Sequence, residues 1–279
     1  MYDIIEVKEN LNIHHGKVNN RLYLMNAKTS NWSQTIDTLQ NIANSNGYNK
    51  IISRVPESAK DSFLSKNFKI EATVPGLYNG KEEGYFFADY NENERGIIED
   101  KKLKVIESVK TIALAAKKDP SEQKLPQGFE LRELNTSDID NILQLNHKVF
   151  SSYPFPIFDR TYLEKCIKEE FDFYGIFKDD ELKVYSYIKK DLQNKFIEII
   201  DFATHPSYRG KNLSQHLVSK IIDEATKQDI HTILCLVRST SYGLNIMLRK
   251  NEFVLGGTLN NNTLIDTSLQ SVNVWYRKI

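Results

Sequence analysis

The sequence predicts an α/β protein, of the α+β kind, in which helices flank a mixed, twisted sheet. Strand and helix patterns alternate along residues 126–279, and the first hundred residues show a similar order of patterns. In addition, 40% of the 279 residues are hydrophobic, which is enough to fill a large core.

The second half of the chain carries the stronger patterns. Strand patterns rich in β-branched and aromatic residues cover 129–134, 171–177, 182–188, 196–204 and 232–237. Amphipathic helix patterns cover 137–149, 160–170, 211–227 and 241–250. The chain then ends in an asparagine-rich turn and an alternating Val-Asn-Val-Trp-Tyr run, which together predict a final pair of strands.

The first half repeats the same order in a degenerate form. Strand patterns at 21–25 and 50–55, helix patterns at 33–44 and 58–66, and two strands around Tyr78-Asn79-Gly80 give the order β-α-β-α-β-β predicted for residues 196–279. A helical spacing over 98–118 and the linker-like segment DPSEQKLPQG follow. We therefore predict an N-terminal domain with a linker helix at 1–120 and a second domain at 121–279.

Charge and cysteine content exclude several classes of protein. Lys plus Arg and Asp plus Glu both number 37, so no net charge favours nucleic acid or a membrane surface. No apolar run approaches the ~18–20 residues that span a membrane, and the first ten residues do not form a signal segment, so we expect a cytoplasmic protein. Cys166 and Cys235 lie in apolar stretches without metal-ligand spacing, so we expect neither a metal nor a disulfide.

The segment HPSYRGKNLSQHLVSKII at 205–222 predicts an anion site. Pro206 ends a strand, Gly210 allows a turn, and a helix follows whose first acid is Asp223. The helix begins instead with Arg209, Lys211 and backbone N–H groups that lack partners and carry partial positive charge. The expected guest is a phosphate, and the alternative is a basic helix terminus on a solvated surface.

This loop resembles the acetyl-CoA loop of the GCN5-related N-acetyltransferases (GNAT), which runs from an Arg or Gln through a Gly to a second small residue. Here that register covers Arg209, Gly210, Lys211, Asn212, Leu213 and Ser214. Asn212 replaces the usual Gly, although Asn tolerates unusual backbone angles, and Ser214 replaces a Gly or Ala. The resemblance implies the GNAT fold, acetyl-CoA as cosubstrate, and pairing of the backbone of Phe202, Ala203 and Thr204 with the pantetheine arm.

A closer resemblance covers nearly the whole chain. The segments PGLYNG, YPFPIFD, DFATHPSYRG, STSYGLN, GTLNNNTLI and SVNVWYRK are similar to those of the beta-lysine N6-acetyltransferase family. That family works beside a lysine 2,3-aminomutase, and its product is a compatible solute or a catabolic intermediate. The resemblance thus implies a small-molecule amine as substrate.

Amine acetylation needs a group that accepts the ammonium proton, and Asp201 and Glu198 are the candidates. We expect them to point to opposite faces of their strand, because three residues separate them, and we favour Asp201 over a purely structural role. Many GNAT proteins supply the leaving thiolate with a proton from a Tyr; Ser241 and Leu248 occupy that register here. Tyr242 and Asn245 lie nearby and are expected to face the cofactor. The alternative for Tyr242 is that it packs in the core. The thiolate can also leave without help from an acid.

A zwitterionic substrate also needs partners for its carboxylate and inner ammonium. The rigid loop at 153–159 is predicted to form a pocket wall, or alternatively an interhelix plug. Arg238 is a candidate carboxylate partner, and the Asn-rich segment near the chain end either contacts substrate or only forms a turn. The substrate-binding candidates are Tyr153, Phe155, Phe158, Arg238, Asn261, Asn262 and Asn273.

Three functions stay open from the sequence: acetylation of beta-lysine, acetylation of another amine such as lysine, a polyamine or a protein lysine, and CoA binding without catalysis. The N-terminal half has no comparable phosphate loop, since NAKTSN links residues 25 and 32. It is expected to join the catalytic half through a shared sheet edge or to form contacts in a homodimer.

Overall fold

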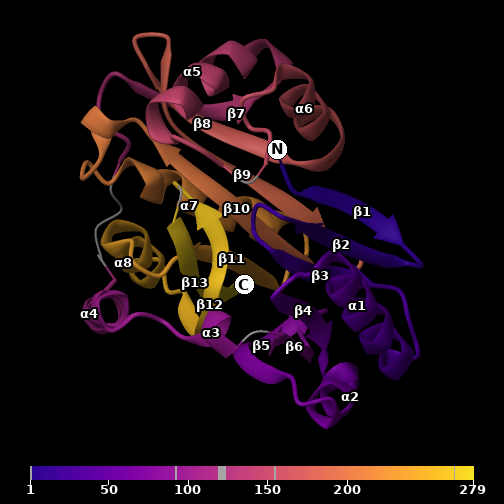
Figure 1. The fold of residues 1–279 in the computed structure, drawn as a ribbon. Coiled ribbons are helices and arrows are strands. Elements are labelled where there is room, and N and C mark those ends of the chain that lie inside the picture. The colour runs from indigo at the N-terminus through magenta and orange to yellow at the C-terminus, as the bar shows by residue number, and fades with distance from the viewer. Residues whose placement is uncertain (1, 92, 119–123, 154, 267) are drawn as a thin grey trace.

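The computed structural model describes residues 2–91, 93–118, 124–153, 155–266 and 268–279 (Figure 1). These residues form a single sheet of thirteen strands in the order β1-β2-β3-β4-β6-β5-β12-β13-β11-β10-β9-β8-β7. Helices cover the outside of this sheet, and the predicted mixed α+β architecture is confirmed. None of the helices in the described part of the chain is long and apolar enough to cross a membrane.

The elements of the first half are β1 (Ile4–Lys8), β2 (Leu11–Gly16), β3 (Arg21–Ala27), α1 (Trp32–Asn46), β4 (Lys50–Pro56), η1 (Glu57–Ala59), α2 (Lys60–Ser65), β5 (Lys69–Tyr78), β6 (Glu82–Tyr90), α3 (Asn93–Gly96) and α4 (Asp100–Ala115). Those of the second half are β7 (Phe129–Leu134), η2 (Thr136–Asp138), α5 (Ile139–Val149), α6 (Arg160–Lys165), η3 (Cys166–Glu170), β8 (Asp172–Lys178), β9 (Glu181–Asp191), β10 (Phe196–Thr204), η4 (Pro206–Tyr208), α7 (Leu213–Lys227), β11 (Thr232–Arg238), α8 (Tyr242–Lys250), β12 (Val254–Ile265) and β13 (Ser268–Lys278).

The two halves share one topology, as the sequence repeat predicts. Strands β1 to β6 occur in the spatial order β1-β2-β3-β4-β6-β5, and strands β8 to β13 occur in the matching order β8-β9-β10-β11-β13-β12. In each half one pair is parallel, β3 with β4 and β10 with β11, and a helix crosses between them. The second half adds β7, α5 and α6 before this unit.

The halves meet edge to edge where β5 pairs antiparallel with β12, at Ala72 and Gly257. A Cβ atom at Gly257 would lie 2.2 Å from the Glu71 carbonyl oxygen, and one at Gly256 would lie 2.5 Å from the Thr73 carbonyl oxygen. Two adjacent glycines are therefore needed for the backbones to approach this closely. The predicted alternative of a shared sheet edge is the one that the structure contains.

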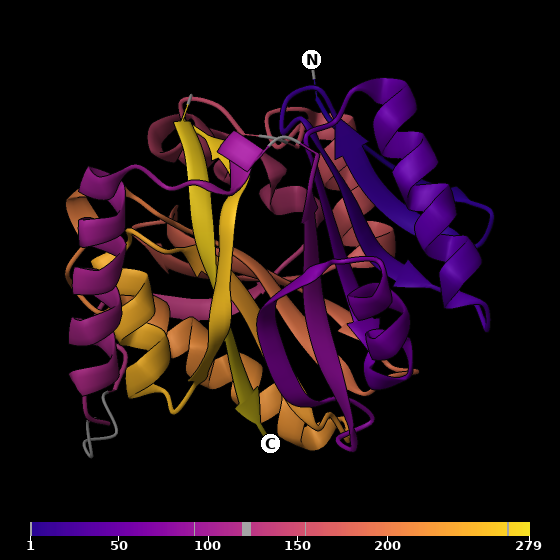
Figure 2. The ribbon, with the colours of Figure 1, turned by 60° about the horizontal axis from the view of Figure 1, so that its bottom comes forward.

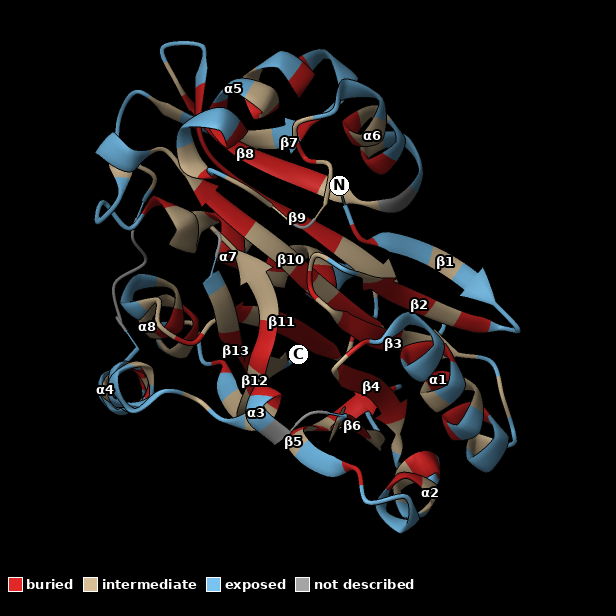
Figure 3. Ribbon diagram, in the orientation of Figure 1, coloured by how far each residue is buried: buried red, intermediate tan, exposed pale blue. Residues whose placement is uncertain are grey.

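Separate apolar clusters hold the helices on the outer faces, and Figure 3 shows the buried residues following the strands. Helices α1 and α2 pack on the first half through residues such as Ile36, Leu39 and Phe63. Helices α7 and α8 pack on the second half through Leu217, Ile221 and Leu248. Each helix buries one stripe and exposes the opposite face, as amphipathic helices do.

The sheet curves so that its two halves face each other across β12 and β13 (Figure 2). Arg54 of β4 forms an ion pair at 2.6 Å with Glu198 of β10, although five strands lie between these two in the sheet. An inner cluster that includes Tyr23, Phe196 and Val272 lines the concave side. Side chains of β3 and β4 thus meet those of β10 on the concave side.

The predicted element bounds are close to the observed ones, with two differences. Strands β1 and β2 were not anticipated from their short, charge-interrupted segments. The helix predicted over 160–170 is α-helical to Lys165 and continues as a π-helical turn. The predicted boundary near residue 120 lies outside the described residues, so the division into two domains stays a prediction; Ala113 of α4 packs into the core of the second half.

Replacing Gly257 by Ala is expected to destabilise the protein by more than about 2 kcal/mol, because the methyl group would displace β5 from β12 and strain a backbone at φ 154°. Urea unfolding measures this change. Gly243→Ala is the matched control, since a Cβ there meets nothing within 4 Å and alanine is the better helix former by up to about 1 kcal/mol. Equal stability of the two variants would show that the junction tolerates a side chain.

Candidate active site

Strands β10 and β11 part in the middle of the sheet. Their parallel pairing joins Phe196–Ile199 to Thr232–Cys235, whereas β10 continues to Thr204 and β11 to Arg238. Beyond Ile199, β10 pairs only with β9. Its other edge therefore presents backbone groups without a strand partner, which can bind an extended ligand by main-chain hydrogen bonds.

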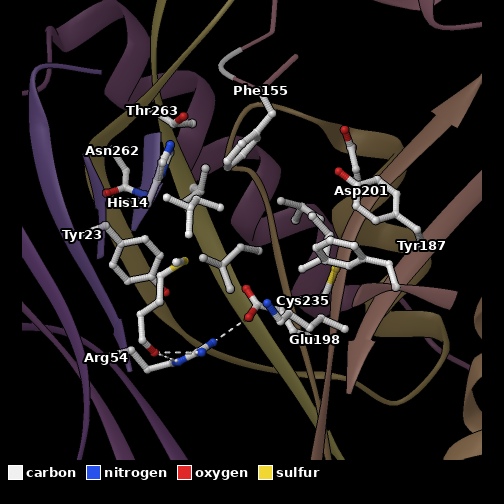
Figure 4. Close-up of a pocket in the computed structure, with 18 of the residues that line it drawn as sticks. His14, Tyr23, Arg54, Phe155, Tyr187, Glu198, Asp201, Cys235, Asn262 and Thr263 are labelled. Carbon is white, nitrogen blue, oxygen red and sulfur yellow. Dashed lines mark hydrogen bonds and ion pairs between the residues drawn. The ribbon is translucent and has the colours of Figure 1, made fainter. Parts of the chain in front are cut away.

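A cavity of about 580 Å³ lies beside this parting of the strands, on the concave side of the sheet. Figure 4 shows its walls, with Asp201 and Tyr187 on one side and His14, Tyr23 and Asn262 on the other. Both halves of the chain line it. Its size and its largely apolar lining with a few polar groups are typical of a small-molecule site.

A β-bulge brings both candidate carboxylates into this cavity. Ile199 pairs with Ile188 and Asp201 pairs with Tyr187, so Ile200 is an extra residue in β10. The extra residue shifts the alternation of side chains, and Glu198 and Asp201 therefore line the same cavity. The expectation of opposite faces was wrong because it assumed an unbroken period of two.

Asp201 is a half-buried acid whose carboxylate is hydrogen-bonded by neighbouring donors. Its carboxylate accepts hydrogen bonds from the Phe202 backbone N–H at 2.7 Å and from the Tyr153 hydroxyl. Burial raises the pKa of Asp201 to about 6, although these donors and Arg238 oppose the shift. A carboxylate with this pKa is ionised at neutral pH and is a better proton acceptor than an exposed Asp.

Glu198 is instead neutralised by Arg54. The Arg54 guanidinium donates to Glu198 at 2.6 Å and to the Met25 carbonyl oxygen at 3.0 Å and 3.2 Å. Burial acts to lower the pKa of Arg54, but the Glu198 carboxylate outweighs it and the net shift is upward. This buried pair ties β4 to β10 across the cavity, and Glu198 is less suited than Asp201 to accept a proton.

The loop at 153–159 walls the cavity with aromatic rings. Tyr153 and Phe155 line it, and Phe155 stacks on His14 of β2 with ring centroids 4.6 Å apart. Asn146 of α5 fixes the loop by donating to the Ile157 carbonyl oxygen at 2.7 Å. Phe158 stacks on His147 away from the cavity, so the predicted substrate contact is not formed by this ring.

The loop before α7 has the geometry of an anion cradle. Gly210 and Asn212 adopt positive φ angles of 76° and 56°, and Asn212 takes the left-handed conformation that its replacement of Gly requires. No side chain caps α7 and no acid lies in its first turn. Ser214 is held to Thr204 at the end of β10 by a 3.1 Å hydroxyl contact, so the loop begins beside the open edge of β10.

The matching helix of the first half is closed. The Asn31 side chain of the β3-to-α1 loop accepts a hydrogen bond from the Gln34 N–H at 3.1 Å. A side-chain cap of this kind satisfies the amide that a phosphate would otherwise bind. The two halves thus differ at the start of the crossover helix. The start of α1 is capped by a side chain, whereas the start of α7 is uncapped and can bind an anion.

Four predicted residues do not line the cavity, and each of them hydrogen-bonds to other parts of the protein. Asn245 is fully buried and uses its whole amide: it donates to Arg238 and Ser241 and accepts from Asn273 and Trp275. Asn273 also accepts from Thr258. Asn261 donates to the carbonyl oxygens of Arg95 and Ile97. Tyr242 is 41% exposed and donates to Ser108 of α4, and none of the four lines the cavity.

Two further predicted residues, Arg238 and Asn262, do line the cavity. Arg238 is half-exposed and lies 3.4 Å from Asp266, its ion-pair partner. Asn262 is buried, and its side-chain oxygen has no hydrogen-bond partner among the described residues.

Sequence reasoning missed the cavity residues of the first half: His14, Arg21, Tyr23 and Arg54. The available signal was a basic residue inside an apolar strand, as in RLYLM and KIISRVP. Buried Arg is rare unless paired. In the described part of the chain, no three His, Cys, Asp or Glu side chains form a group that could hold a metal ion.

An open strand edge, an uncapped helix start and a cavity with a proton acceptor are features that acetyl transfer from a nucleotide thioester to an amine requires. The acetyltransferase (GNAT) family model matches residues 138–244, a range that contains the parting strands, the bulge and the loop before α7. The predicted GNAT fold is confirmed, and the protein is an acetyl-CoA-dependent N-acetyltransferase.

Over its whole length the chain is similar to beta-lysine N6-acetyltransferases, as the sequence motifs indicated. It is 27% identical to that enzyme of Methanococcus maripaludis over 280 residues, covering 99% of both chains. It is 23% identical to that of Methanosarcina mazei, covering 86% of this chain and 95% of the relative. The N-acetyltransferase YodP of Bacillus subtilis is 31% identical over 54% of this chain and 55% of its own.

Placing a carboxylate at the start of α7 is expected to weaken acetyl-CoA binding. Asn212→Asp should raise the KM for acetyl-CoA by about tenfold or more through repulsion of the diphosphate, while the helix dipole keeps the melting temperature from falling. Steady-state kinetics and thermal unfolding measure the two effects. Ser219→Asp adds the same charge on the exposed middle of α7 and should leave the KM within about twofold; equal KM values in both variants would contradict the cradle.

Asp201→Asn is expected to stabilise the fold and to slow the reaction. The folded-state pKa of Asp201 is raised to about 6, whereas the unfolded-state pKa is near 4. The Asp201 carboxyl therefore does not lower the stability of the fold below about pH 4, where it is protonated in both states, and it lowers that stability most above about pH 6, where it is ionised in both. Removing that charge should add about 1–3 kcal/mol at pH 7 and almost nothing at pH 4. Urea unfolding at both pH values measures this.

In the same variant kcat should fall by about 100-fold at neutral pH, with little change in acetyl-CoA affinity. The wild-type rate should decline as the pH falls through about 6, and this decline should be absent from the variant. Equal activity of the two proteins at every pH would remove Asp201 from the mechanism.

Proposed function

We propose that the protein transfers the acetyl group of acetyl-CoA directly to the N6 amine of beta-lysine. The observation that carries this proposal is the single cavity that holds an ionisable carboxylate beside the parted strands and polar side chains on its opposite wall. Such a cavity suits a short chain with an amine at one end and charged groups at the other. The full-length similarity to beta-lysine N6-acetyltransferases supports the choice of substrate.

The cosubstrate is expected to bind between β10 and α7. The Arg209 N–H donates to the Pro206 carbonyl oxygen, and residues 210–214 offer the N–H groups at the uncapped start of α7 for the diphosphate. A Cβ atom at Gly210 would have no other atom within 4 Å, so a ligand can approach the backbone there. The free edge of Phe202, Ala203 and Thr204 then offers backbone groups to the pantetheine arm. When bound, acetyl-CoA supplies the activated acyl group, and the protein supplies position and donors.

Asp201 is the residue that handles the proton of the amine. A lysine-like ammonium has a pKa near 10.4, so it arrives charged and must lose a proton before it can attack. The Asp201 carboxylate attracts the ammonium and accepts this proton directly or through water. Burial and the Asp201 charge hold the pKa of Tyr153 well above its usual value, so this hydroxyl stays a donor and orients the carboxylate.

The leaving group needs no acid from the protein. A thiol has a pKa near 8.5, and its thiolate is therefore a far better leaving group than an alkoxide. Tyr242, the sequence candidate for this role, hydrogen-bonds to Ser108 instead. As part of the same proposal the enzyme acts in the cytoplasm on a free small molecule, and its balanced charge supports this because neither nucleic acid nor a membrane surface is favoured.

A comparison of amine substrates tests the proposal. Thiol release from acetyl-CoA should be fastest, by kcat/KM, with beta-lysine, slower with alpha-lysine, and slowest with spermidine and a lysine-containing peptide, since these two acceptors lack the free carboxylate and ammonium that the polar wall would bind. Mass spectrometry of the product should place the acetyl group on N6. A best rate with spermidine or the peptide would refute the proposed substrate, and absence of turnover together with a rise in melting temperature on adding acetyl-CoA would indicate a CoA-binding protein without catalysis.

A further inference from the structure

One wall of the cavity carries buried polar atoms that have no partner. Nine side-chain N or O atoms are buried without a hydrogen bond among the described residues, and five of them belong to residues that line this cavity. These five are Asn12 Oδ1, His14 Nε2, Arg21 Nε, the Tyr23 hydroxyl and Asn262 Oδ1. Buried polar atoms are normally satisfied, so their concentration here indicates a missing ligand with polar groups of its own.

The strands of the first half bring these side chains together. His14 of β2 pairs across the sheet with Tyr23 of β3, and Arg21 lies two residues before Tyr23 on the same face. The Arg21 guanidinium lies 5.5 Å from the centre of the Tyr23 ring. Asn262 of β12 closes the group, because its carbonyl oxygen accepts from Arg21 Nη1 at 2.6 Å.

Arg21 is a buried cation that forms no ion pair with a carboxylate, although the Asp3 carboxylate attracts it at longer range. Its side chain contacts a carbonyl oxygen and, at 3.4 Å, His14 Nδ1, and none of the ion pairs among the described residues includes it. The other buried cations of the same region are paired: Lys50 with Glu71 at 2.9 Å and Arg54 with Glu198 at 2.6 Å. An unpaired buried charge is costly, and an anion would relieve that cost.

His14 adds a donor and no charge to this wall. Burial, together with Arg21 and His15, lowers the pKa of His14 to about 2, so the ring is neutral at physiological pH. Arg21 donates to His14 Nδ1, which places the remaining ring proton on Nε2. The wall therefore offers His14 and Arg21 N–H donors for an anion and the Asn12 and Asn262 side-chain oxygens for an ammonium.

We infer that this wall binds the amino-acid end of the acceptor, with Arg21 of the degenerate half as the specificity-determining partner of its carboxylate. The inference rests on the proposed function and deepens it by assigning the substrate class to amino acids with a side-chain amine. Figure 4 shows Asp201 on the wall opposite His14 and Asn262, which Arg21 contacts. A ligand held at Arg21 therefore directs its far amine toward the parted strands. Leu236, Ile265 and Val272 line the cavity as well and suit the intervening methylene groups.

Arg21 fits this role better than Arg238, the partner favoured by sequence. Arg238 already has an acidic neighbour in Asp266, and its side chain is 39% exposed, so solvent screens its charge. It also lies close enough to Asp201 to lower that residue's pKa. A carboxylate held by Arg238 would thus lie on the reactive side of the cavity and would leave Arg21 unpaired.

The experiment compares beta-lysine with 1,4-diaminopentane, the same molecule without its carboxylate. In the full-length protein, Arg21→Gln should raise the KM for beta-lysine by about 100-fold with little change in kcat, because a buried charge pair is lost. The kcat/KM for the diamine should change by less than about threefold. Arg21→Lys keeps the charge without the planar fork and should give an intermediate loss of about tenfold, again for beta-lysine alone.

Arg238→Gln is the matched control and should lower the activity on the two acceptors by the same factor. The inference is overturned if Arg21→Gln, with an unchanged melting temperature, affects both acceptors equally, or if Arg238→Gln is the variant that discriminates between them. Should Arg21→Gln not fold, an equal effect of Arg21→Lys on both acceptors overturns the inference instead.

Failure of the proposed substrate gives a different result. If the wild-type enzyme prefers alpha-lysine, the beta-lysine assignment is wrong, and the Arg21 variants are then compared on alpha-lysine and its own decarboxylated diamine, where the carboxylate-dependent loss is still expected. A wild-type enzyme that uses the diamines as well as the amino acids would overturn the role of Arg21.

Discussion

The active site depends on the close approach of two backbones, at β5 and β12. Gly256 and Gly257 allow this approach, and it converts two similar sheets into one curved sheet. Only because of that curvature does β4 meet β10, so that the Arg54–Glu198 pair forms across the interior. The cavity is therefore a product of the joining of the two halves, and neither half alone contains both of its walls.

The interior of this cavity contains several charges that oppose folding. Asp201 is held at a pKa of about 6, and Arg21 has no acidic partner in the described part of the chain. Burying such groups costs free energy that the surrounding apolar clusters must offset. This cost is typical of sites that are complementary to a ligand, since the same groups become satisfied when the ligand is present. The paired Arg54 and Glu198 show the contrasting case, in which the protein satisfies its own charges.

Much of the fold followed from periodicity, and the site followed less completely. The order of strands and helices, the repeat and the loop at 209–214 were recognisable because each is a local pattern of residue types. The common orientation of Glu198 and Asp201 was not recognisable, since one extra residue in β10 reverses the alternation and leaves no mark in composition. The roles of Asn245 and Asn273 were likewise hidden, because an amide that binds a ligand and an amide that binds Trp275 look alike in sequence. Arg21 was missed because its importance lies in the lack of an ion-pair partner, which a sequence does not reveal.

The two copies of the fold treat the start of their crossover helix differently. In the first, Asn31 occupies the terminus of α1; in the second, the terminus of α7 is left uncapped. On the proposed function, the polypeptide therefore binds one coenzyme molecule although it contains two related scaffolds. The first half then holds no nucleotide, and its inner strands contribute side chains to the proposed acceptor cavity instead.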